Sequence, residues 1–236
     1  MMKDIFKVMQ KKQYNNELNY RMYIPQDYNS NKSYSLLIFL HGAGERGEDN
    51  ELHIKYNVNI LQRTIDHEVY SKECIIIAPQ CPPSCQWVNT PWENGDYRVS
   101  DVEISKPMSS LVGLIDEILE EYNINKNKIY ISGISMGGYG TWYLLMTNPQ
   151  LFAAGIPVCG GADSTMAENI KNIPIWTFHG DVDSAVPVSG TRTMVKALKD
   201  IGADIRYTEY PDVNHNSWVN AFNEPELLDW IFSKSK

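Results

Sequence analysis

The sequence predicts an α/β protein with a mostly parallel central sheet of about eight strands and helices on both faces. Short apolar runs alternate with longer amphipathic segments along most of the chain, which is typical of βαβ units. The runs at 35–40 and 74–78 are almost continuously apolar, as expected of strands covered on both faces. A chain of 236 residues can bury a full core, and we expect residues 1–236 to form one domain.

The expected elements follow one another without a repeat or a linker. The predicted strands lie at 5–13, 18–24, 35–40, 74–78, 128–132, 152–158, 173–178 and 204–210. The predicted helices lie within 51–67 and at 107–122, 136–146, 188–201 and 217–233. Between 79 and 107 the chain has little periodicity but carries three large aromatic residues, and irregular segments of this length are often functional.

Charge and composition exclude several classes of function. The 21 basic residues against 29 acidic ones give a net charge of −8, which disfavours nucleic acid and anionic membrane surfaces as partners. No apolar stretch approaches the ~18 residues that a membrane-spanning helix needs. The first residues show no signal-peptide pattern, so we expect a cytoplasmic protein, although a secreted protein without its leader would look the same.

The cysteine count predicts neither a disulfide scaffold nor a metal site. Cys81 and Cys85 could form a bridge in an oxidising compartment if the intervening turn brings them together, but we expect free thiols. Because they lie near no second cysteine pair or histidine, zinc is not expected, and we expect no other metal or cofactor.

A nucleophile elbow is the strongest motif of the chain. Gly133-Ile134-Ser135-Met136-Gly137 lies between a predicted strand and a predicted helix, which is the context that such an elbow requires. The turn is so sharp that Ser135 must adopt a strained conformation, and a Cβ at Gly133 or Gly137 would collide with neighbouring backbone. We therefore predict that Ser135 is a nucleophile exposed at the end of the sheet.

An activated serine needs a base, and the base needs an acid that orients it. His215 follows a late strand and is the one histidine after both Ser135 and a candidate acid, so we predict it as the base. Asp183 is the preferred acid because it lies deep in the loop after residues 173–178. Asp181 in the same loop is expected to stabilise the turn, and Asp212 is a weaker alternative for orienting His215.

A tetrahedral intermediate also needs two preorganised donors for its oxyanion. We predict the backbone amides of Met136, which follows the nucleophile, and of Ala43, in the glycine-rich loop after residues 35–40. Glu45 and Arg46 are expected to pair with each other and hold that loop. The remaining histidines have structural interpretations, two of them (His41 and His179) tying loops together and two (His53 and His67) lying on the surface.

Over essentially its whole length the chain resembles an α/β-hydrolase-fold serine esterase, and more narrowly compact bacterial carboxylesterases. The resemblance rests on the motifs at 40–47, 78–81, 133–142 and 215–218. It implies hydrolysis of carboxylic esters without a metal or cofactor. The same likeness implies Ser135, Asp183 and His215 as the triad, with Ala43 and Met136 as oxyanion donors. The related oligopeptidases carry a large additional domain, so a peptidase is disfavoured.

Aromatic residues near the predicted site indicate the class of ester. Trp87 and Trp218 lie on loops at the catalytic edge and are candidate platforms for a sugar ring or a phenolic acyl group, and Gln80 is a further candidate for substrate binding. We expect feruloyl or acetyl esters of plant polysaccharide. The alternatives are a general short-chain carboxylesterase or lysophospholipase-like enzyme, and, from a different class, a hydrolase-like binding protein without catalysis.

Overall fold

The computed structural model describes residues 2–236 and contains one eight-stranded sheet in the order β1-β2-β4-β3-β5-β6-β7-β8. All pairs from β4 through β8 are parallel, whereas β2 runs antiparallel to both β1 and β4. The expected mostly parallel sheet of about eight strands is therefore confirmed. The strands are β1 (Met9–Tyr14), β2 (Leu18–Tyr23), β3 (Tyr34–Leu40), β4 (Cys74–Gln80), β5 (Ile124–Ile134), β6 (Ala154–Val158), β7 (Ile175–Gly180) and β8 (Ile205–Tyr210).

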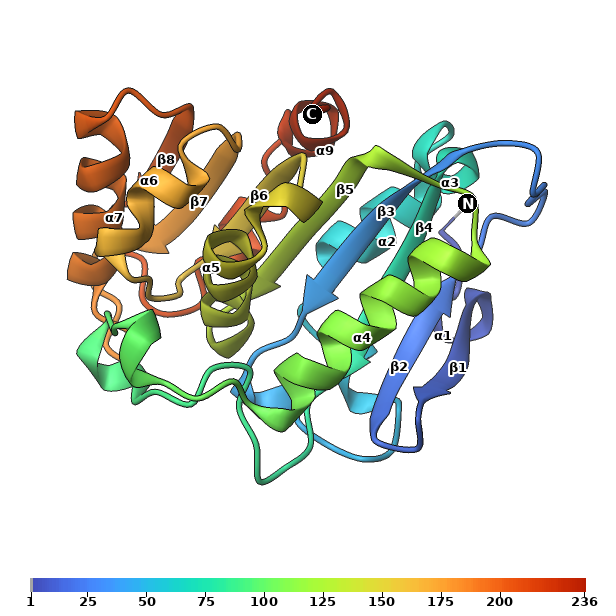
Figure 1. Cartoon of the computed structure of the whole chain (residues 1–236), viewed down its shortest axis with the longest axis horizontal. Coiled ribbons are helices and arrows are strands. Elements are labelled where there is room, and N and C mark those ends of the chain that lie inside the picture. The colour runs from blue at the N-terminus through green and yellow to red at the C-terminus, as the bar shows by residue number, and fades with distance from the viewer. Residues whose placement is uncertain (1) are drawn as a thin grey trace.

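Helices cover both faces of this sheet, as the alternating pattern predicts (Figure 1). The helices are α1 (Ile5–Val8), α2 (Asn59–Asp66), α3 (Tyr70–Glu73), α4 (Lys106–Glu121), α5 (Met136–Thr147), α6 (Ala167–Ile170), α7 (Val188–Asp200), α8 (Trp218–Ala221) and α9 (Leu227–Phe232). One core layer joins the sheet to α4, α5, α6 and α7, and the other joins it to α2, α8 and α9. The strands between the two layers are buried on both sides, which explains their continuous apolar runs.

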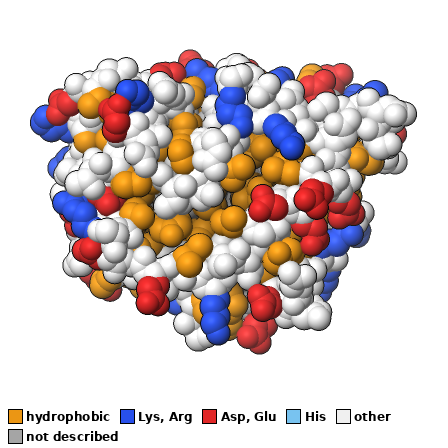
Figure 2. All heavy atoms as spheres, viewed as in Figure 1, with side chains coloured by type: hydrophobic (Ala, Val, Ile, Leu, Met, Phe, Trp, Pro, Cys, Tyr) orange, Lys and Arg blue, Asp and Glu red, His pale blue; other side chains and the backbone are white. Residues whose placement is uncertain are grey.

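The longest helix shows how the sequence positions these layers. Ser105 caps α4 by accepting a hydrogen bond from the amide of Met108, and Pro107 occupies the first turn, where a proline is tolerated. Its apolar side, which includes Leu111 and Ile115, is fully buried against the sheet. Figure 2 shows hydrophobic side chains in the middle of this face, around the space between α4 and α5, and most charged side chains nearer its margins.

The two ends of the chain differ from the sequence prediction. The strand expected at 5–13 begins as the short helix α1, which Asp4 caps, and becomes a strand only at Met9. The single helix expected at 217–233 is divided into α8 and α9, because Pro225 disfavours helical backbone in the residue before it. The irregular segment between 80 and 106 is confirmed apart from two short 3-10 turns.

Among residues 2–236, no helix combines the length and the apolar character needed to cross a bilayer. The cytoplasmic location stays a prediction.

Candidate active site

The elbow adopts the strained geometry that the motif predicts. Ser135 lies between β5 and α5 with φ 53° and ψ −117°, a backbone conformation that L-residues rarely adopt. Its own amide donates to the Val158 carbonyl (2.9 Å), which fixes the turn against β6. A Cβ on Gly137 would lie 1.9 Å from the Leu40 carbonyl oxygen, and one on Gly133 would lie 2.3 Å from the carbonyl oxygen of Gly137. Both glycines are therefore required by the close approach of backbone.

Three side chains from separate loops form one hydrogen-bonded chain at the carboxyl end of the sheet. The Nε2 atom of His215 lies 2.7 Å from Ser135 Oγ, and its Nδ1 atom lies 2.7 Å from Asp183 Oδ2. Asp183 follows β7 and His215 follows β8, so parallel strands bring these distant residues to the same edge. Ser135 is half-buried and the His215 side chain is 24% exposed, which leaves the serine hydroxyl accessible from solvent.

The structure distinguishes the candidate acids. The Asp183 side chain has no exposed surface, and its Oδ1 atom accepts hydrogen bonds from the amides of Ala185 and Val186 (2.9 Å each). Asp181 instead accepts from the amide of Asp212 (2.8 Å) and so stabilises a turn, as expected. Asp212 is an exposed turn residue with φ 58°. Only Asp183 among these three is hydrogen-bonded to His215 in the described part of the chain.

The Asp183 carboxyl is held in its ionised form. Burial by itself raises the pKa of a carboxyl group, but hydrogen bonds from His179 and His215 outweigh this effect and hold the pKa of Asp183 well below its usual range. An ionised carboxylate beside Nδ1 keeps a proton on that nitrogen, so Nε2 is available to accept a proton from Ser135 Oγ. The three groups can therefore deprotonate a serine hydroxyl.

The two predicted oxyanion donors lie at the starts of two helical turns. Met136 is the first residue of α5, and Ala43 is the first residue of the 3-10 turn Ala43–Glu45. Neither amide donates a hydrogen bond to another group within residues 2–236. Amides at the start of a helix are unpaired by geometry and carry the positive end of its dipole, so both are suited to bind an anion.

Buried side chains anchor the loop that carries Ala43. The Nδ1 atom of His41 lies 2.6 Å from the Gly42 carbonyl, and its Nε2 accepts from the Cys81 amide (2.9 Å). The indole of Trp87 donates to the His41 carbonyl (3.1 Å). The structural interpretation of His41 is therefore confirmed.

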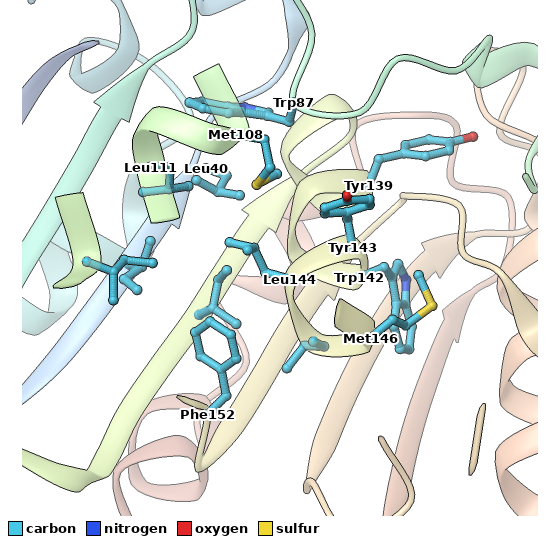
Figure 3. Packing of buried hydrophobic residues seen from close by; sticks show 14 of the residues in the cluster. Leu40, Trp87, Met108, Leu111, Tyr139, Trp142, Tyr143, Leu144, Met146 and Phe152 are labelled. Carbon is cyan, nitrogen blue, oxygen red and sulfur yellow. The ribbon is translucent and has the colours of Figure 1, made fainter. Parts of the chain in front are cut away.

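Two of the predicted substrate contacts are wrong. Trp87 has no exposed surface, because its ring packs in the core beside Met108 (Figure 3) while its indole nitrogen bonds to the loop. Gln80 is 1% exposed, and both ends of its amide are used, by Asp49 Oδ1 (2.8 Å) and by the Asn50 amide (2.7 Å). Trp218 is half-buried beside His215, and its role in substrate binding stays a prediction.

Two predictions about polar residues near the site are also wrong. His53 is 1% exposed and not on the surface, because its ring is buried against β4, where Nε2 lies 3.0 Å from the Ala78 carbonyl. In residues 2–236, no ion pair joins Glu45 to Arg46. Glu45 instead accepts from Asn57 (2.7 Å), and Arg46 donates to the carbonyls of Ala43 (2.9 Å) and Cys85 (3.3 Å).

Sequence reasoning missed Asn57, which connects the two sides of the site. Its amide nitrogen donates to Glu45 Oε1 (2.7 Å), and its amide oxygen accepts from the Trp218 indole (3.0 Å). Trp218 in turn packs edge-on against His215, with ring centroids 5.4 Å apart. Asn57 has φ 59°, and asparagine tolerates this left-handed conformation better than most residues. Nothing in the local sequence distinguishes this asparagine from an ordinary turn residue.

One group of side chains in residues 2–236 has the spacing of metal ligands. The ligand atoms of Cys159, Asp183 and His215 lie within 4.8 Å of one another. Two of these atoms already bond to each other, and burial raises the pKa of the Cys159 thiol, which disfavours the thiolate that a metal requires. The donor set fits a hydrogen-bonded chain better than a metal centre. All four cysteines are free thiols, as expected.

Comparison with known proteins identifies relatives along most of the chain. Residues 28–225 match the sequence model of the phospholipase/carboxylesterase family. Lysophospholipase-like protein 1 of Mus musculus is 26% identical over 84% of this chain and 86% of its own length. The bifunctional acetylxylan esterase/xylanase XynS20E of Neocallimastix patriciarum is 26% identical over 50% of this chain, which spans 20% of that protein.

The fold has a close counterpart among solved structures. The crystal structure of a thermostable esterase superposes with a TM-score of 0.85 at 37% identity, over 98% of this chain and 64% of the other. The chain described here thus spans about two thirds of that esterase, and about a fifth of the acetylxylan esterase/xylanase. The α/β-hydrolase fold expected from the sequence is confirmed.

Proposed function

Because the chain belongs to the phospholipase/carboxylesterase family of α/β-hydrolases, we propose that it is a serine hydrolase of carboxylic esters that works through an acyl-enzyme. The observation that carries the proposal is the hydrogen-bonded chain from Ser135 Oγ through His215 to Asp183, with 2.7 Å at each contact. It places a nucleophile, a base and an orienting acid in the relation that acyl transfer requires.

The reaction begins when Ser135 Oγ attacks the ester carbonyl and His215 Nε2 takes its proton. The amides of Met136 and Ala43 donate to the oxyanion of the tetrahedral intermediate. His215 then returns the proton to the leaving alcohol, which gives the acyl-enzyme. In the second half, His215 Nε2 takes a proton from water as the water oxygen attacks the acyl carbonyl. The second tetrahedral intermediate then collapses, His215 returns the proton to Ser135 Oγ, and the carboxylic acid leaves.

Replacement of Ser135 by alanine tests this proposal directly. We expect Ser135→Ala to abolish turnover of a short-chain nitrophenyl ester, because the remaining groups have no nucleophile to activate. A fluorophosphonate probe should label Ser135 in the unaltered protein and leave Ser135→Ala unlabelled. Near-normal turnover by folded Ser135→Ala would refute the assignment. Absence of labelling and turnover in the unaltered protein would favour the hydrolase-like binding protein.

For the substrate we propose acetyl or feruloyl esters of plant polysaccharide. The acetylxylan esterase portion named for one relative supports the acetyl ester. The half-buried rings of Trp218, beside His215, and of Trp92, on the irregular segment, offer apolar faces for a sugar or phenolic ring. These partners are small molecules or polysaccharide chains, and the proposal includes no nucleic acid or membrane.

The second candidate is a short-chain carboxylesterase or lysophospholipase-like enzyme. It is favoured by the mouse lysophospholipase-like protein, because that alignment spans most of both chains. A series of nitrophenyl esters of increasing chain length, assayed beside methyl ferulate and acetylated xylan, separates the two. Turnover of nitrophenyl esters with no ferulate or xylan turnover would decide for the second candidate. Highest efficiency on short acyl chains would then indicate the carboxylesterase, and highest efficiency on acyl chains of about eight carbons or longer the lysophospholipase-like enzyme, because each buried methylene adds binding energy.

A further inference from the structure

A second histidine contacts the carboxylate of Asp183. His179 is the penultimate residue of β7 and has no exposed surface. Its Nε2 atom lies 3.2 Å from Asp183 Oδ2, the same oxygen that His215 Nδ1 contacts at 2.7 Å. The sequence predicts only that His179 ties loops together by hydrogen bonds. The structure gives it that role, through the Val186 carbonyl (3.0 Å), and adds the contact with Asp183.

The acceptors that face His179 fix the direction of the hydrogen bonds at its Nε2 atom. The Val186 carbonyl and the Asp183 carboxylate are both acceptors, so Nε2 carries a proton and donates. On the other side of the ring, Nδ1 lies 2.8 Å from Thr191 Oγ1, which is also 3.1 Å from the Gly160 carbonyl. Thr191 on α7 thereby holds the ring in its orientation toward Asp183.

The carboxylate of Asp183 is therefore fixed by four donors. Two backbone amides donate to Oδ1 and His215 Nδ1 donates to Oδ2. The Nε2–H of His179 lies 3.2 Å from Oδ2 and is shared between that oxygen and the Val186 carbonyl (3.0 Å). Without His179, the Oδ2 atom would keep His215 as its one donor. Apart from that bond, only the two amide hydrogen bonds to Oδ1 would limit rotation of the carboxylate. A misplacement of such a positioning group by even 1 Å can reduce a rate by about 10²-fold.

We propose that His179 is a positioning residue for the acid: its Nε2–H holds Asp183 Oδ2 in line with His215 Nδ1 and shares the negative charge of that oxygen. This inference rests on the proposed function, since it requires that Asp183 orient a catalytic base. A second N–H near Asp183 Oδ2 makes this carboxylate a weaker base, so the proton stays on His215 Nδ1 through the reaction.

Other titratable groups near this pair leave its charge balance unchanged at neutral pH. Burial raises the pKa of the Cys159 thiol and of the Tyr139 hydroxyl, so both stay neutral beside Asp183. Glu209 on β8 is near His179 but is paired with Arg192 of α7 at 2.6 Å. His215 is the remaining partner of the carboxylate.

The test compares His179→Leu with His179→Gln in the full chain, using a short-chain nitrophenyl ester. Leucine removes the donor, and we expect kcat to fall by about 10- to 100-fold with little change in KM, because alignment is lost and ground-state binding is not. The acidic limb of the kcat/KM profile should move to higher pH, because Asp183 then interacts with His215 alone. Glutamine can supply an N–H at a similar place and should restore most of kcat.

Labelling with a fluorophosphonate counts the active sites, so that kcat is expressed per folded site. Thr191→Val, which removes the hydroxyl that orients the ring, should lower kcat in the same direction but by less. The inference would be overturned if His179→Leu kept a normal kcat per labelled site and an unmoved acidic limb. If that variant does not fold, the same result for Thr191→Val would overturn it. In either case the proposed function would stand. An unaltered protein that neither labels nor hydrolyses an ester would overturn both.

Discussion

At the scale of single residues, the site depends on which of two neighbouring aspartates contacts the base. Asp181 and Asp183 follow the same strand, yet one accepts from a turn amide and the other from His215. Both residues are half-buried as whole residues, but the Asp183 side chain has no exposed surface and its Oδ1 accepts from the amides of Ala185 and Val186. Burial makes a charge costly unless it is fully hydrogen-bonded, and the donors around Asp183 meet that requirement.

Replacing each aspartate by asparagine tests this assignment. We expect Asp183→Asn to reduce kcat by orders of magnitude, since an amide cannot stabilise the imidazolium that forms on His215 and favours the wrong tautomer. Asp181→Asn should cost much less, because asparagine can still accept a hydrogen bond from the Asp212 amide. The rates are measured on a nitrophenyl ester, with circular dichroism to establish that both variants fold. A larger loss for Asp181→Asn would reverse the roles.

At the scale of elements, the site is assembled from loops that follow the strand ends. Hydrogen bonds between these loops are also needed to hold them in place. Asn57 supplies two, because it bonds to Glu45 in the loop of Ala43 and to Trp218 at the start of α8. One proposed oxyanion donor and the flank of His215 therefore share a single anchor. The residue lies in an irregular turn ahead of α2, so its two bonds position elements that are distant in sequence.

Asn57→Gly removes both bonds while keeping a residue that accepts positive φ. We expect about a tenfold loss of kcat, because the Ala43 loop and the His215 flank would no longer be held together. Asn16→Gly is the matched control, since Asn16 also has φ 59° but lies in the turn between β1 and β2. Equal activity of the two variants per labelled serine would show that the connection is unnecessary.

The features that the sequence predicted and those it missed differ in their physical origin. The positions of Ser135, Asp183 and His215 follow from motifs at strand ends, and parallel strands bring such ends together whatever the loops do. The burial of Trp87 and Gln80 depends on how an irregular segment folds back on the sheet, and no periodicity encodes that. Asn57 and His179 were missed as positioning residues because their partners are defined only by tertiary contact.

At the scale of the whole molecule, two buried histidines near the site make the stability of the folded protein depend on pH. The rings of His41 and His53 have centroids 6.0 Å apart and are each 1% exposed. Burial lowers the pKa of His41 to about 4. Burial, reinforced by the neighbouring His41, lowers the pKa of His53 to about 3. Both rings therefore remain neutral in the folded protein at pH values where the unfolded chain binds protons.

The sign of the resulting effect follows from proton counting. Above pH 6.5, the ordinary histidine value, neither state binds these protons and stability is unaffected. Between pH 6.5 and about 4, the unfolded chain binds protons that the folded protein excludes, so the free energy of unfolding falls as the pH is lowered. Each such histidine contributes a slope of about 1.4 kcal/mol per pH unit within this window.

His53→Gln tests this prediction, because glutamine can still donate to the Ala78 carbonyl but does not titrate. We expect the slope of the unfolding free energy against pH, measured by urea denaturation between pH 6 and about 4.5, to decrease by about 1.4 kcal/mol per pH unit. Asn223→Gln, a substitution at an exposed residue with no titratable group, is the control and should retain the original slope. If the unfolding free energy of His53→Gln falls as steeply with decreasing pH as that of the unaltered protein, the neutral His53 ring does not cause the acid sensitivity.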